Sequence, residues 1–337
     1  MTTVATPDTQ SRIDAFLQER GFAARGARLV PLTPDASDRR YFRLLLDDGA
    51  SLVIAVYSGA IEYASMPFAQ VADLFERMAM PIPGVLDHSD PLGIVLQEDL
   101  GDVTLQAHVG AATVTEHAAL YREAVALIAR LQTEAVAFAS DGYVPFTLAF
   151  DVEKLTFELN FFAQHFLEGY RAVALSRAEK EALAHEWSAI AEELAAEPRV
   201  LCHRDYHSRN LMLHEHRLFL IDFQDARMGP DTYDLVSLLR DSYVDLTEPE
   251  VNALVACFLE QIGSPEPAEF RRRFDLMAVQ RNIKALGTFG FQASARGNPA
   301  YIQYMPRTLR SVRDNFSKHN RFGRLQELLA AHVEELR

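Results

Sequence analysis

The chain has 337 residues, of which 49% are hydrophobic and 24% charged, which excludes a disordered or low-complexity protein and suits two lobes that share a cleft. The net charge of −14, from 33 basic and 47 acidic residues, argues against nucleic acid and membranes as partners. Cys202 and Cys257 lie far apart and lack metal-ligand spacing, so we expect a reducing compartment. Residues 1–10 carry no apolar run and no stretch of the sequence could span a membrane, so we expect that compartment to be the cytoplasm.

The first hundred residues are predicted to form a sheet with helical cover. Two β-prone runs, 41–46 and 51–57, flank the turn Asp47-Asp48-Gly49, and this arrangement predicts a β-hairpin. The other elements expected here are a helix at 12–20, a helix with the apolar face Phe68, Val71, Phe75 and Met78, and a strand at 93–96.

Beyond Gly101 the pattern changes to long amphipathic helices. Capping-box patterns at Thr113-x-x-Glu116 and Ser176-x-x-Glu179 predict two helix starts, and short strands at 211–213 and 218–221 interrupt the helical pattern. We therefore place a boundary near 97–101, between an N-terminal nucleotide-binding lobe of residues 1–97 and a C-terminal catalytic and substrate-binding lobe of residues 98–337.

Three oxygen-bearing side chains flank the hairpin predicted at 211–221. Asp205 and Asn210 lie on one loop before the hairpin and Asp222 lies just after it, so folding of the hairpin should bring the three together. A carboxylate and an amide oxygen suit Mg²⁺, which prefers hard oxygen ligands and leaves part of its shell to substrate phosphates. Asp205 is then available to orient a hydroxyl group and to accept its proton during phosphoryl transfer.

The surrounding residues strengthen this interpretation. The loop reads His203-Arg204-Asp205-Tyr206-His207-Ser208-Arg209-Asn210, and Ile221-Asp222-Phe223 and Pro230-Asp231-Thr232-Tyr233-Asp234 follow it. These motifs resemble the protein-kinase-like superfamily, and most closely its aminoglycoside phosphotransferase and choline kinase branch. The resemblance implies a two-lobed α+β fold with a small antiparallel-sheet N-terminal lobe and a larger, mainly helical C-terminal lobe. It also implies Asp205 as the base and Asn210 with Asp222 as Mg²⁺ ligands.

Four further segments carry a finer resemblance: Asp35–Arg43, Gln97–Asp102, Leu239–Tyr243 and Gln280–Gly287. They are similar to the sugar kinases of cell-wall recycling that phosphorylate N-acetylmuramate and N-acetylglucosamine at the anomeric hydroxyl. The resemblance implies ATP as phosphoryl donor and an amino sugar as acceptor, in peptidoglycan recycling. The ATP-binding residues that it implies are Gln97, Glu98 and Leu100 in the adenine-binding hinge, and Ser37 and Arg40 over the phosphates.

One departure from the family pattern concerns phosphate binding. No lysine occurs before Lys154, although the family anchors the α- and β-phosphates with a strand lysine. A guanidinium can bind phosphate through two hydrogen bonds, so Arg39, Arg40 and Arg43 are candidate replacements, and we favour Arg40.

The glycine-rich loop is replaced by Asp35-Ala36-Ser37-Asp38, and the glycine after Asp222-Phe223 is replaced by Gln224. The first segment can still form a turn whose backbone N–H groups bind phosphate. Gln224 is a candidate for assisting the metal or the substrate.

The acceptor pocket is expected to use residues outside the catalytic loop. Arg281 and Lys284 are three residues apart on one side of a helix and could bind the lactyl carboxylate of N-acetylmuramate. His207 either contacts the sugar or braces the loop, and Asp234 is expected to support the loop. The predicted substrate-binding residues are His207, Arg240, Asp241, Arg281 and Lys284.

Two alternatives stay open from the sequence. One is a kinase of another small molecule, such as an aminoglycoside, choline, homoserine or a different sugar. The other is a nucleotide-binding pseudokinase that scaffolds a partner, which the missing lysine and glycine-rich loop favour and the intact set of Asp205, Asn210 and Asp222 disfavours. The oligomeric state does not follow from the sequence.

Overall fold

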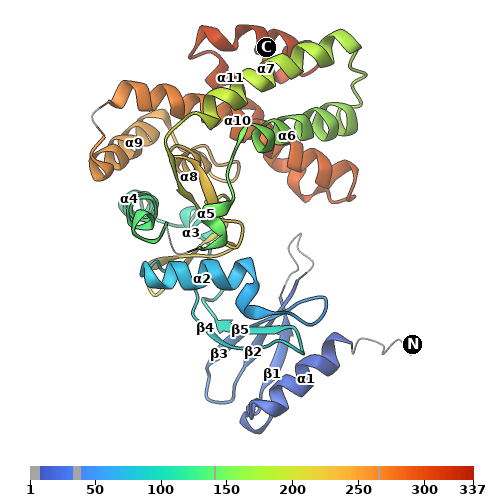
Figure 1. The fold of residues 1–337 in the computed structure, drawn as a ribbon, viewed down its shortest axis with the longest axis vertical. Helices are drawn as coiled ribbons and strands as arrows, with labels where there is room; N and C mark the ends of the chain where they lie inside the picture. The colour runs from blue at the N-terminus through green and yellow to red at the C-terminus, as the bar shows by residue number, and fades with distance from the viewer. Residues whose placement is uncertain (1–7, 33–38, 140–141, 265) are drawn as a thin grey trace. The chain divides into compact units, whose positions relative to one another are not determined.

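The computed structural model describes residues 8–32, 39–139, 142–264 and 266–337 (Figure 1). The chain forms two compact units: residues up to Val103 with Met212–Gln224, and Thr104–Leu211 with Asp225–Arg337. The first unit extends past the predicted boundary at 97–98 and includes a hairpin from the middle of the chain. Backbone hydrogen bonds explain this, because Leu213 N donates to Val103 O and Leu220 N to Pro81 O, each at 2.7 Å.

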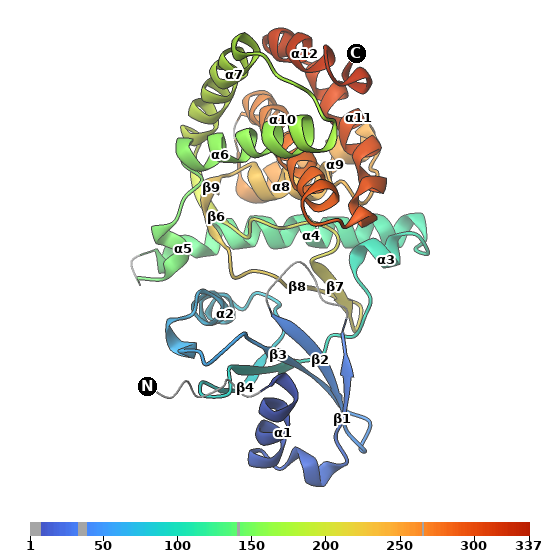
Figure 2. The same cartoon turned by 90° about the vertical axis from the view of Figure 1, so that its right-hand side faces the viewer.

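The first unit contains an antiparallel sheet of five strands in the order β1-β2-β3-β5-β4 (Figures 1 and 2). The predicted hairpin is present as β2 and β3, in which Tyr41 pairs with Ala55. The unit comprises α1 (Thr9–Glu19), β1 (Arg28–Pro31), β2 (Arg40–Leu45), β3 (Ser51–Val56), α2 (Pro67–Arg77), β4 (Val85–Ser89), β5 (Ile94–Glu98), β7 (Leu211–His214), β8 (Arg217–Leu220) and two 3₁₀ turns, η1 (Phe22–Arg25) and η2 (Tyr63–Ser65).

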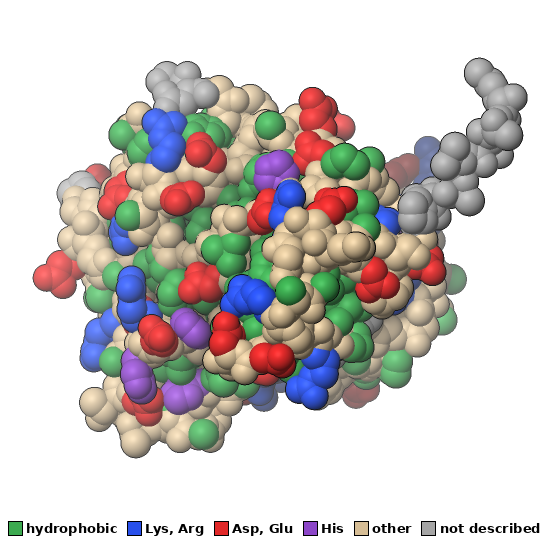
Figure 3. Space-filling view, turned by 90° about the horizontal axis from the view of Figure 1, so that it is seen from below, with side chains coloured by type: hydrophobic (Ala, Val, Ile, Leu, Met, Phe, Trp, Pro, Cys, Tyr) green, Lys and Arg blue, Asp and Glu red, His purple; other side chains and the backbone are tan. Residues whose placement is uncertain are grey.

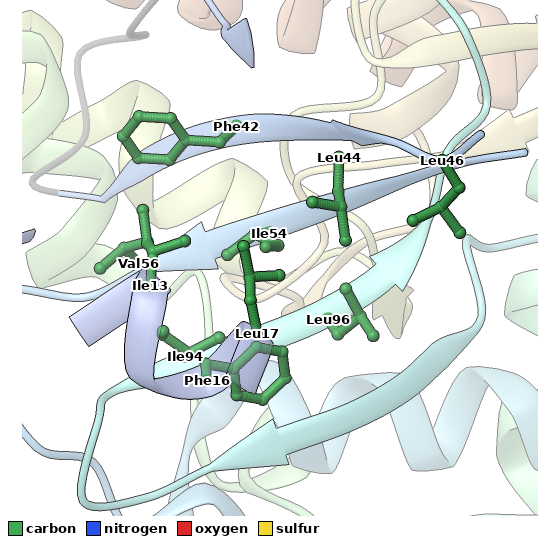
Figure 4. Packing of buried hydrophobic residues seen from close by; sticks show 10 residues of the cluster. All are labelled: Ile13, Phe16, Leu17, Phe42, Leu44, Leu46, Ile54, Val56, Ile94 and Leu96. Atoms are coloured by element: carbon green, nitrogen blue, oxygen red, sulfur yellow. The ribbon is translucent and has the colours of Figure 1, made fainter. Parts of the chain in front are cut away.

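Strand alternation decides which face of β2 meets the core. Phe42 and Leu44 belong to the buried cluster that also contains Ile13 and Phe16 of α1 (Figure 4). Successive side chains of a strand point to opposite faces, so Arg43 lies on the face away from α1. The same alternation places Arg40 on the α1 face.

The second unit is mainly helical, with one two-stranded antiparallel sheet, β6 (Arg199–Cys202) with β9 (Arg227–Pro230). Both helix starts predicted from capping patterns are present: the side chain of Thr113 accepts from Glu116 N, and Ser176 forms a capping box with Glu179. The helices are α3 (Leu105–Val109), α4 (Val114–Glu134), α5 (Val144–Thr147), α6 (Val152–Phe162), the π-helix η4 (Ala163–Tyr170), α7 (Arg177–Ala195), α8 (Tyr233–Leu239), α9 (Glu248–Ile262), α10 (Pro267–Ser294), α11 (Met305–Phe316), α12 (Gly323–Ala330) and the 3₁₀ turns η3 (Ala135–Phe138), η5 (Pro299–Tyr304), η6 (Asn320–Phe322) and η7 (Glu334–Leu336).

Helix α10 runs through the middle of this unit and contacts α6, η4, α8 and α11 (Figure 2). Two glycines allow its backbone to approach the neighbouring helix closely. A Cβ at Gly287 would lie 2.9 Å from the backbone of Phe162, and one at Gly290 would lie 2.5 Å from the carbonyl oxygen of His165. Larger residues would push the helices apart, so these glycines determine where α10 lies.

Charged and apolar side chains are mixed over the face seen in Figure 3, where acidic and basic residues alternate. Within residues 8–32, 39–139, 142–264 and 266–337, none of the helices combines the length and the apolar character that crossing a bilayer requires.

Candidate active site

The loop between β6 and the start of β7 carries Asp205, and a buried carboxylate holds its first half. Asp234, in the first turn of α8, is fully buried and accepts the backbone N–H groups of His203 at 2.6 Å and Arg204 at 3.0 Å. These bonds fix Arg204 in a left-handed conformation with φ of 82°, which is costly for a residue with a side chain. Asp234 therefore supports the catalytic loop, as the sequence analysis expected.

A second buried carboxylate holds the other half of the loop. Oδ2 of Asp241 accepts the backbone N–H of Ser208 at 3.0 Å and also the hydroxyl of Ser208, and its Oδ1 accepts the N–H of Tyr243 at 2.8 Å. Burial raises the pKa of Asp241, and these hydrogen bonds counteract that effect. Asp241 therefore supports the loop, and its predicted contact with the substrate stays a prediction, because Asp241 also lines the cavity described below.

Three cations surround the Asp205 carboxylate. Lys284 Nζ lies 3.7 Å and Arg281 Nη2 3.9 Å from its Oδ1, and Arg204 Nε lies 3.8 Å from its Oδ2. Burial opposes ionisation of Asp205, but the positive charges of Lys284, Arg204 and Arg281 outweigh it and hold the pKa below its ordinary value. The carboxylate is therefore ionised at neutral pH and available as a proton acceptor.

A cavity of the second unit opens beside Asp205. It brings together the predicted base and all five predicted substrate-binding residues: His207, Arg240, Asp241, Arg281 and Lys284. Its complete lining is Asp205, His207, Ser237, Arg240, Asp241, Ser242, Tyr243, Arg281, Asn282, Lys284, Ala285, Thr288 and Phe289.

The polar groups of the lining residues differ in how many contacts they make within the protein. Arg240 is paired with Glu248 at 2.7 Å, so its charge is balanced within the protein. Arg281 donates from Nε to the hydroxyl of Ser237 at 3.0 Å. Burial lowers the pKa of Lys284 to about 8, with a further contribution from Arg281.

His207 is neutral in this environment. Burial lowers the pKa of its imidazole to about 3, against the opposing effect of Asp205. The ring stands edge-on to Tyr243, with centroids 5.2 Å apart, and Nδ1 is buried without a hydrogen-bond partner among the residues described. His207 lines the cavity and also belongs to the loop, so contact with the sugar and bracing of the loop both stay predictions.

Sequence reasoning missed an aromatic cluster beside the cavity. Tyr243 and Phe289 line the cavity, Tyr301 stacks on Phe289 with centroids 5.7 Å apart, and Tyr304 stands edge-on to Tyr243 at 4.7 Å. The guanidinium of Arg209 lies 5.0 Å from the Tyr243 ring centre. Tyr243 could have been found, because it ends one of the family-like segments, whereas Tyr301 and Tyr304 stand in no recognised motif.

In the first unit, Asp222 follows β8 and has a left-handed backbone with φ of 63°. Its Oδ1 accepts a hydrogen bond from Gln224 Nε2 at 2.8 Å and lies 3.8 Å from Arg39 Nη2. Arg39 Nη1 in turn donates to Gln224 Oε1 at 3.5 Å. Gln224, which replaces the family's glycine, therefore links Asp222, the predicted metal ligand, to Arg39.

The other two candidate arginines are engaged elsewhere. Arg40, which the sequence analysis favoured, is exposed, donates to the Thr9 hydroxyl at 3.1 Å and lies on the α1 face of β2. Arg43 pairs with Asp99 at 2.6 Å and Asp102 at 2.8 Å. Arg39 immediately precedes β2 and Arg40 begins it, and the structure brings Arg39, not Arg40, to Asp222.

The donor groups of the expected metal site fit Mg²⁺ chemically. Asn210 donates from Nδ2 to the Asp205 carbonyl at 3.0 Å, which orients the amide and distinguishes its oxygen end from its nitrogen end. An amide oxygen and the Asp222 carboxylate are both hard ligands. Asn210 belongs to the second unit and Asp222 to the first, so the pair stays a prediction. In the described part of the chain, no cluster of three or more His, Cys, Asp or Glu side chains could hold a metal.

Of the expected hinge residues, Gln97 and Glu98 end β5 and Leu100 follows it. Gln97 is buried within the strand, and Glu98 accepts the N–H of Gly84 at 3.2 Å through its carboxylate. The carbonyl of Leu100 lies 3.2 Å from His214 Nδ1. Ser37 lies outside the described residues.

Comparisons with known proteins agree with these motifs. The model of the phosphotransferase enzyme family matches residues 28–272. The N-acetylmuramate/N-acetylglucosamine kinase of Neisseria meningitidis serogroup B is 34% identical over 307 residues, 89% of this chain and 88% of that protein. The kinase of the same name from Pseudomonas aeruginosa is 33% identical over 335 residues, 95% and 94% of the two chains.

Similar solved structures include a choline/ethanolamine kinase family protein from Mesorhizobium loti, with a TM-score of 0.61 and 17% identity over 98% of this chain and 99% of that chain. The gentamicin–APH(2″)-IIa complex gives a TM-score of 0.59 at 17% identity, over 88% of this chain and 96% of that chain. These likenesses, with the antiparallel sheet and the mainly helical second unit, confirm the predicted two-lobed α+β fold.

Proposed function

The chain belongs to the phosphotransferase enzyme family, and from that premise we propose that it phosphorylates the anomeric hydroxyl of N-acetylmuramate or N-acetylglucosamine with ATP. The match to the family model and the relatives at 33–34% identity confirm the predicted family, and the chain is therefore a phosphotransferase. The names of those relatives support the amino-sugar acceptor, because the matched segments span 88% and 94% of their lengths.

The observation that carries the proposal is the ionised Asp205 at the edge of a cavity lined by cations and aromatic rings. Such a lining suits a small polar acceptor with an anionic group, because aromatic faces pack on sugar rings and cations bind carboxylates. A polycationic aminoglycoside would be repelled by Arg281 and Lys284. A lactyl carboxylate would be attracted by them.

Asp205 would act on the acceptor hydroxyl. Its carboxylate accepts a hydrogen bond from that hydroxyl and takes the proton as the oxygen bonds to the γ-phosphorus of ATP. An anomeric hydroxyl is more acidic than an ordinary alcohol, so orientation contributes more here than deprotonation. The loop is well suited to orientation, because Asp234 and Asp241 fix the backbone on both sides of Asp205.

The nucleotide would be held by residues of the first unit. We assign phosphate binding to Arg39 rather than Arg40, because Arg39 is the candidate that lies beside Asp222. Gln97, Glu98 and Leu100 stay proposed for the adenine and Ser37 for the phosphates. Mg²⁺ on Asn210 and Asp222 would neutralise charge on the phosphates when bound. The proposal includes a role in peptidoglycan recycling. It also includes a reducing compartment such as the cytoplasm, because Cys202 and Cys257 are free thiols.

The test is ADP release with ATP, Mg²⁺ and a panel of N-acetylmuramate, N-acetylglucosamine, choline and an aminoglycoside, followed by acid treatment of the product. Acid-labile phosphate on either amino sugar supports the proposal. Acid-stable phosphate would move the reaction to another hydroxyl, and turnover of choline or the aminoglycoside alone would replace the acceptor. Binding of ATP without any turnover would favour the pseudokinase.

A further inference from the structure

The environment of the reacting oxygen contains a cation with unused donors. The acceptor hydroxyl would lie about 2.7 Å from Asp205 Oδ1, the distance of an ordinary O–H···O bond. Lys284 Nζ and Arg281 Nη2 approach that same oxygen at 3.7 and 3.9 Å, too far for hydrogen bonds but close enough for a third group beside them to contact the oxygen and a cation at once. A group bound at Oδ1 is therefore next to both cations.

The two cations are not equivalent. Arg281 is held by its bond to Ser237, and its guanidinium lies 5.9 Å from the centre of the Tyr233 ring. The ammonium of Lys284 lines the cavity, its side chain is 15% exposed, and Nζ makes no hydrogen bond to any residue in the described ranges. An ammonium group has three N–H donors, so all three remain for a ligand or water.

The backbone of α10 makes the position of Lys284 rigid. Gly287 stands one turn further along the same helix and touches the backbone of Phe162, and Gly290 touches the backbone at His165. These close contacts leave α10 little freedom to slide. The backbone that carries Lys284 is thus in place before substrate binds, and such preorganisation favours stabilisation of a transition state by a charge.

On the basis of the proposed function, we propose that Lys284 is a catalytic residue that donates hydrogen bonds to the phosphoryl oxygens during transfer. The acceptor oxygen forms its bond to the γ-phosphorus, the bond from that phosphorus to the β,γ-bridging oxygen breaks, and ADP leaves. The hydroxyl proton goes to Asp205. Lys284 keeps its own protons throughout and offsets the negative charge on the equatorial oxygens.

This role differs from the carboxylate binding that the sequence predicted for Lys284. Kinetics with the two acceptor sugars distinguish the two roles. N-acetylmuramate has a lactyl carboxylate and N-acetylglucosamine has none. A residue that binds the carboxylate affects only the first sugar, whereas a residue that acts on the phosphoryl group affects both sugars equally.

The experiment measures kcat and KM for both sugars in Lys284→Met, Lys284→Arg and the control Lys180→Met, a lysine on α7 that is 53% exposed and paired with Glu168. We expect Lys284→Met to lower kcat about 100-fold or more for both sugars, with both sugar KM values changed less than about threefold. Lys284→Arg should restore part of kcat. Lys180→Met should match the wild type, and melting curves check that each variant is folded.

The pH profile provides a second readout. The charged groups that face Lys284 are Asp205, Arg281, Arg204 and Glu158, and the pKa of Lys284 is lowered to about 8. The protonated form is the active one, so kcat of the wild type should fall as pH rises above about 8, and this decrease should be absent from Lys284→Arg below pH 10.

An unchanged kcat in Lys284→Met, with KM raised for N-acetylmuramate alone, would overturn the inference and return Lys284 to carboxylate binding. Failure of the proposed function looks different, since the wild type would then phosphorylate neither sugar. In that case the same variants are compared in the slow hydrolysis of ATP by water, in which Lys284→Met should again be at least about tenfold slower. Equal hydrolysis rates would reject the role of Lys284.

Discussion

Asp205 and Asp222 are carboxylates of the same kind on two loops that flank one hairpin, yet they are held by different means. Asp205 is 23% exposed at its side chain, lies within 4 Å of three cations and stands between backbone segments fixed by Asp234 and Asp241. Asp222 is 40% exposed at its side chain and is contacted by Gln224 and Arg39.

The difference follows from what each carboxylate is proposed to do. A base must stay ionised in a partly buried position, so its loop needs neighbouring cations and rigid support. A metal ligand obtains its positive partner from the ion itself, so fewer protein cations are needed around it. Changes near Asp205 should therefore affect the chemical step, and changes near Asp222 should affect the nucleotide.

The largest effect is expected for Asp205→Asn, which removes the proton acceptor but keeps the size of the side chain. We expect kcat to fall about 1000-fold, with the sugar KM changed less than about threefold. Steady-state kinetics with Asp314→Asn as a surface control would test this. Equal losses in kcat and in sugar affinity would show that Asp205 binds the sugar more than it catalyses.

The next effect separates two adjacent arginines. Arg39→Ala should raise the KM for ATP about 10- to 100-fold, because a charge-assisted contact to phosphate is lost, and Arg40→Ala should change it less than about twofold. The two variants remove adjacent arginines with different partners, Asp222 for Arg39 and Thr9 for Arg40. A larger effect of Arg40→Ala would restore Arg40 as the phosphate ligand and contradict the assignment made from the structure.

His207 provides a test of burial near Asp205. Its pKa is about 3 in the folded protein, below the ordinary value of about 6.5, so the unfolded chain binds the proton more readily. Its contribution to stability is present above pH 6.5 and is lost as pH falls towards 3. Between pH 7.5 and 5, the wild type should lose about 1–2 kcal/mol more unfolding free energy than His207→Gln, measured by urea denaturation. Parallel pH curves would mean that His207 is solvated.

The smallest effect is expected at the amide that links Asp222 to Arg39. Gln224→Ala removes one neutral contact to each partner and should raise the KM for ATP about two- to fivefold, with kcat within about threefold of the wild type. Gln303→Ala, an exposed glutamine on η5, is the matched control. If Gln224→Ala lowered kcat as strongly as Asp205→Asn, the loops of Asp205 and Asp222 would both act in the chemical step, which would contradict the separate roles assigned to them.

Much of the fold was predictable because its signals are local. The hairpin of β2 and β3, the helix from Pro67 and the helix start at Ser176 follow from turn residues, apolar spacing and capping residues that lie within a few positions of each other. The catalytic loop was recognised for the same reason, since Asp205 and Asn210 are five residues apart on one turn. The predicted cavity residues also lie together around Asp205.

The roles of individual side chains depended on distant partners. Asp241 was expected to bind the substrate, and its further role in holding Ser208, 33 residues away, could not be predicted. Arg40 was favoured over Arg39, and the contact that distinguishes them joins Arg39 to Gln224, 185 residues away.

The sequence by itself therefore determined the family, the two-lobed α+β fold and the loop that carries Asp205, because backbone propensity and short motifs are properties of neighbouring residues. Only the tertiary structure decided that Arg39 meets Asp222, that Asp241 supports the loop and that Lys284 faces the Asp205 carboxylate. Those contacts depend on which face of a strand or helix meets which neighbour, and close packing of separate elements such as α10 and η4 determines that.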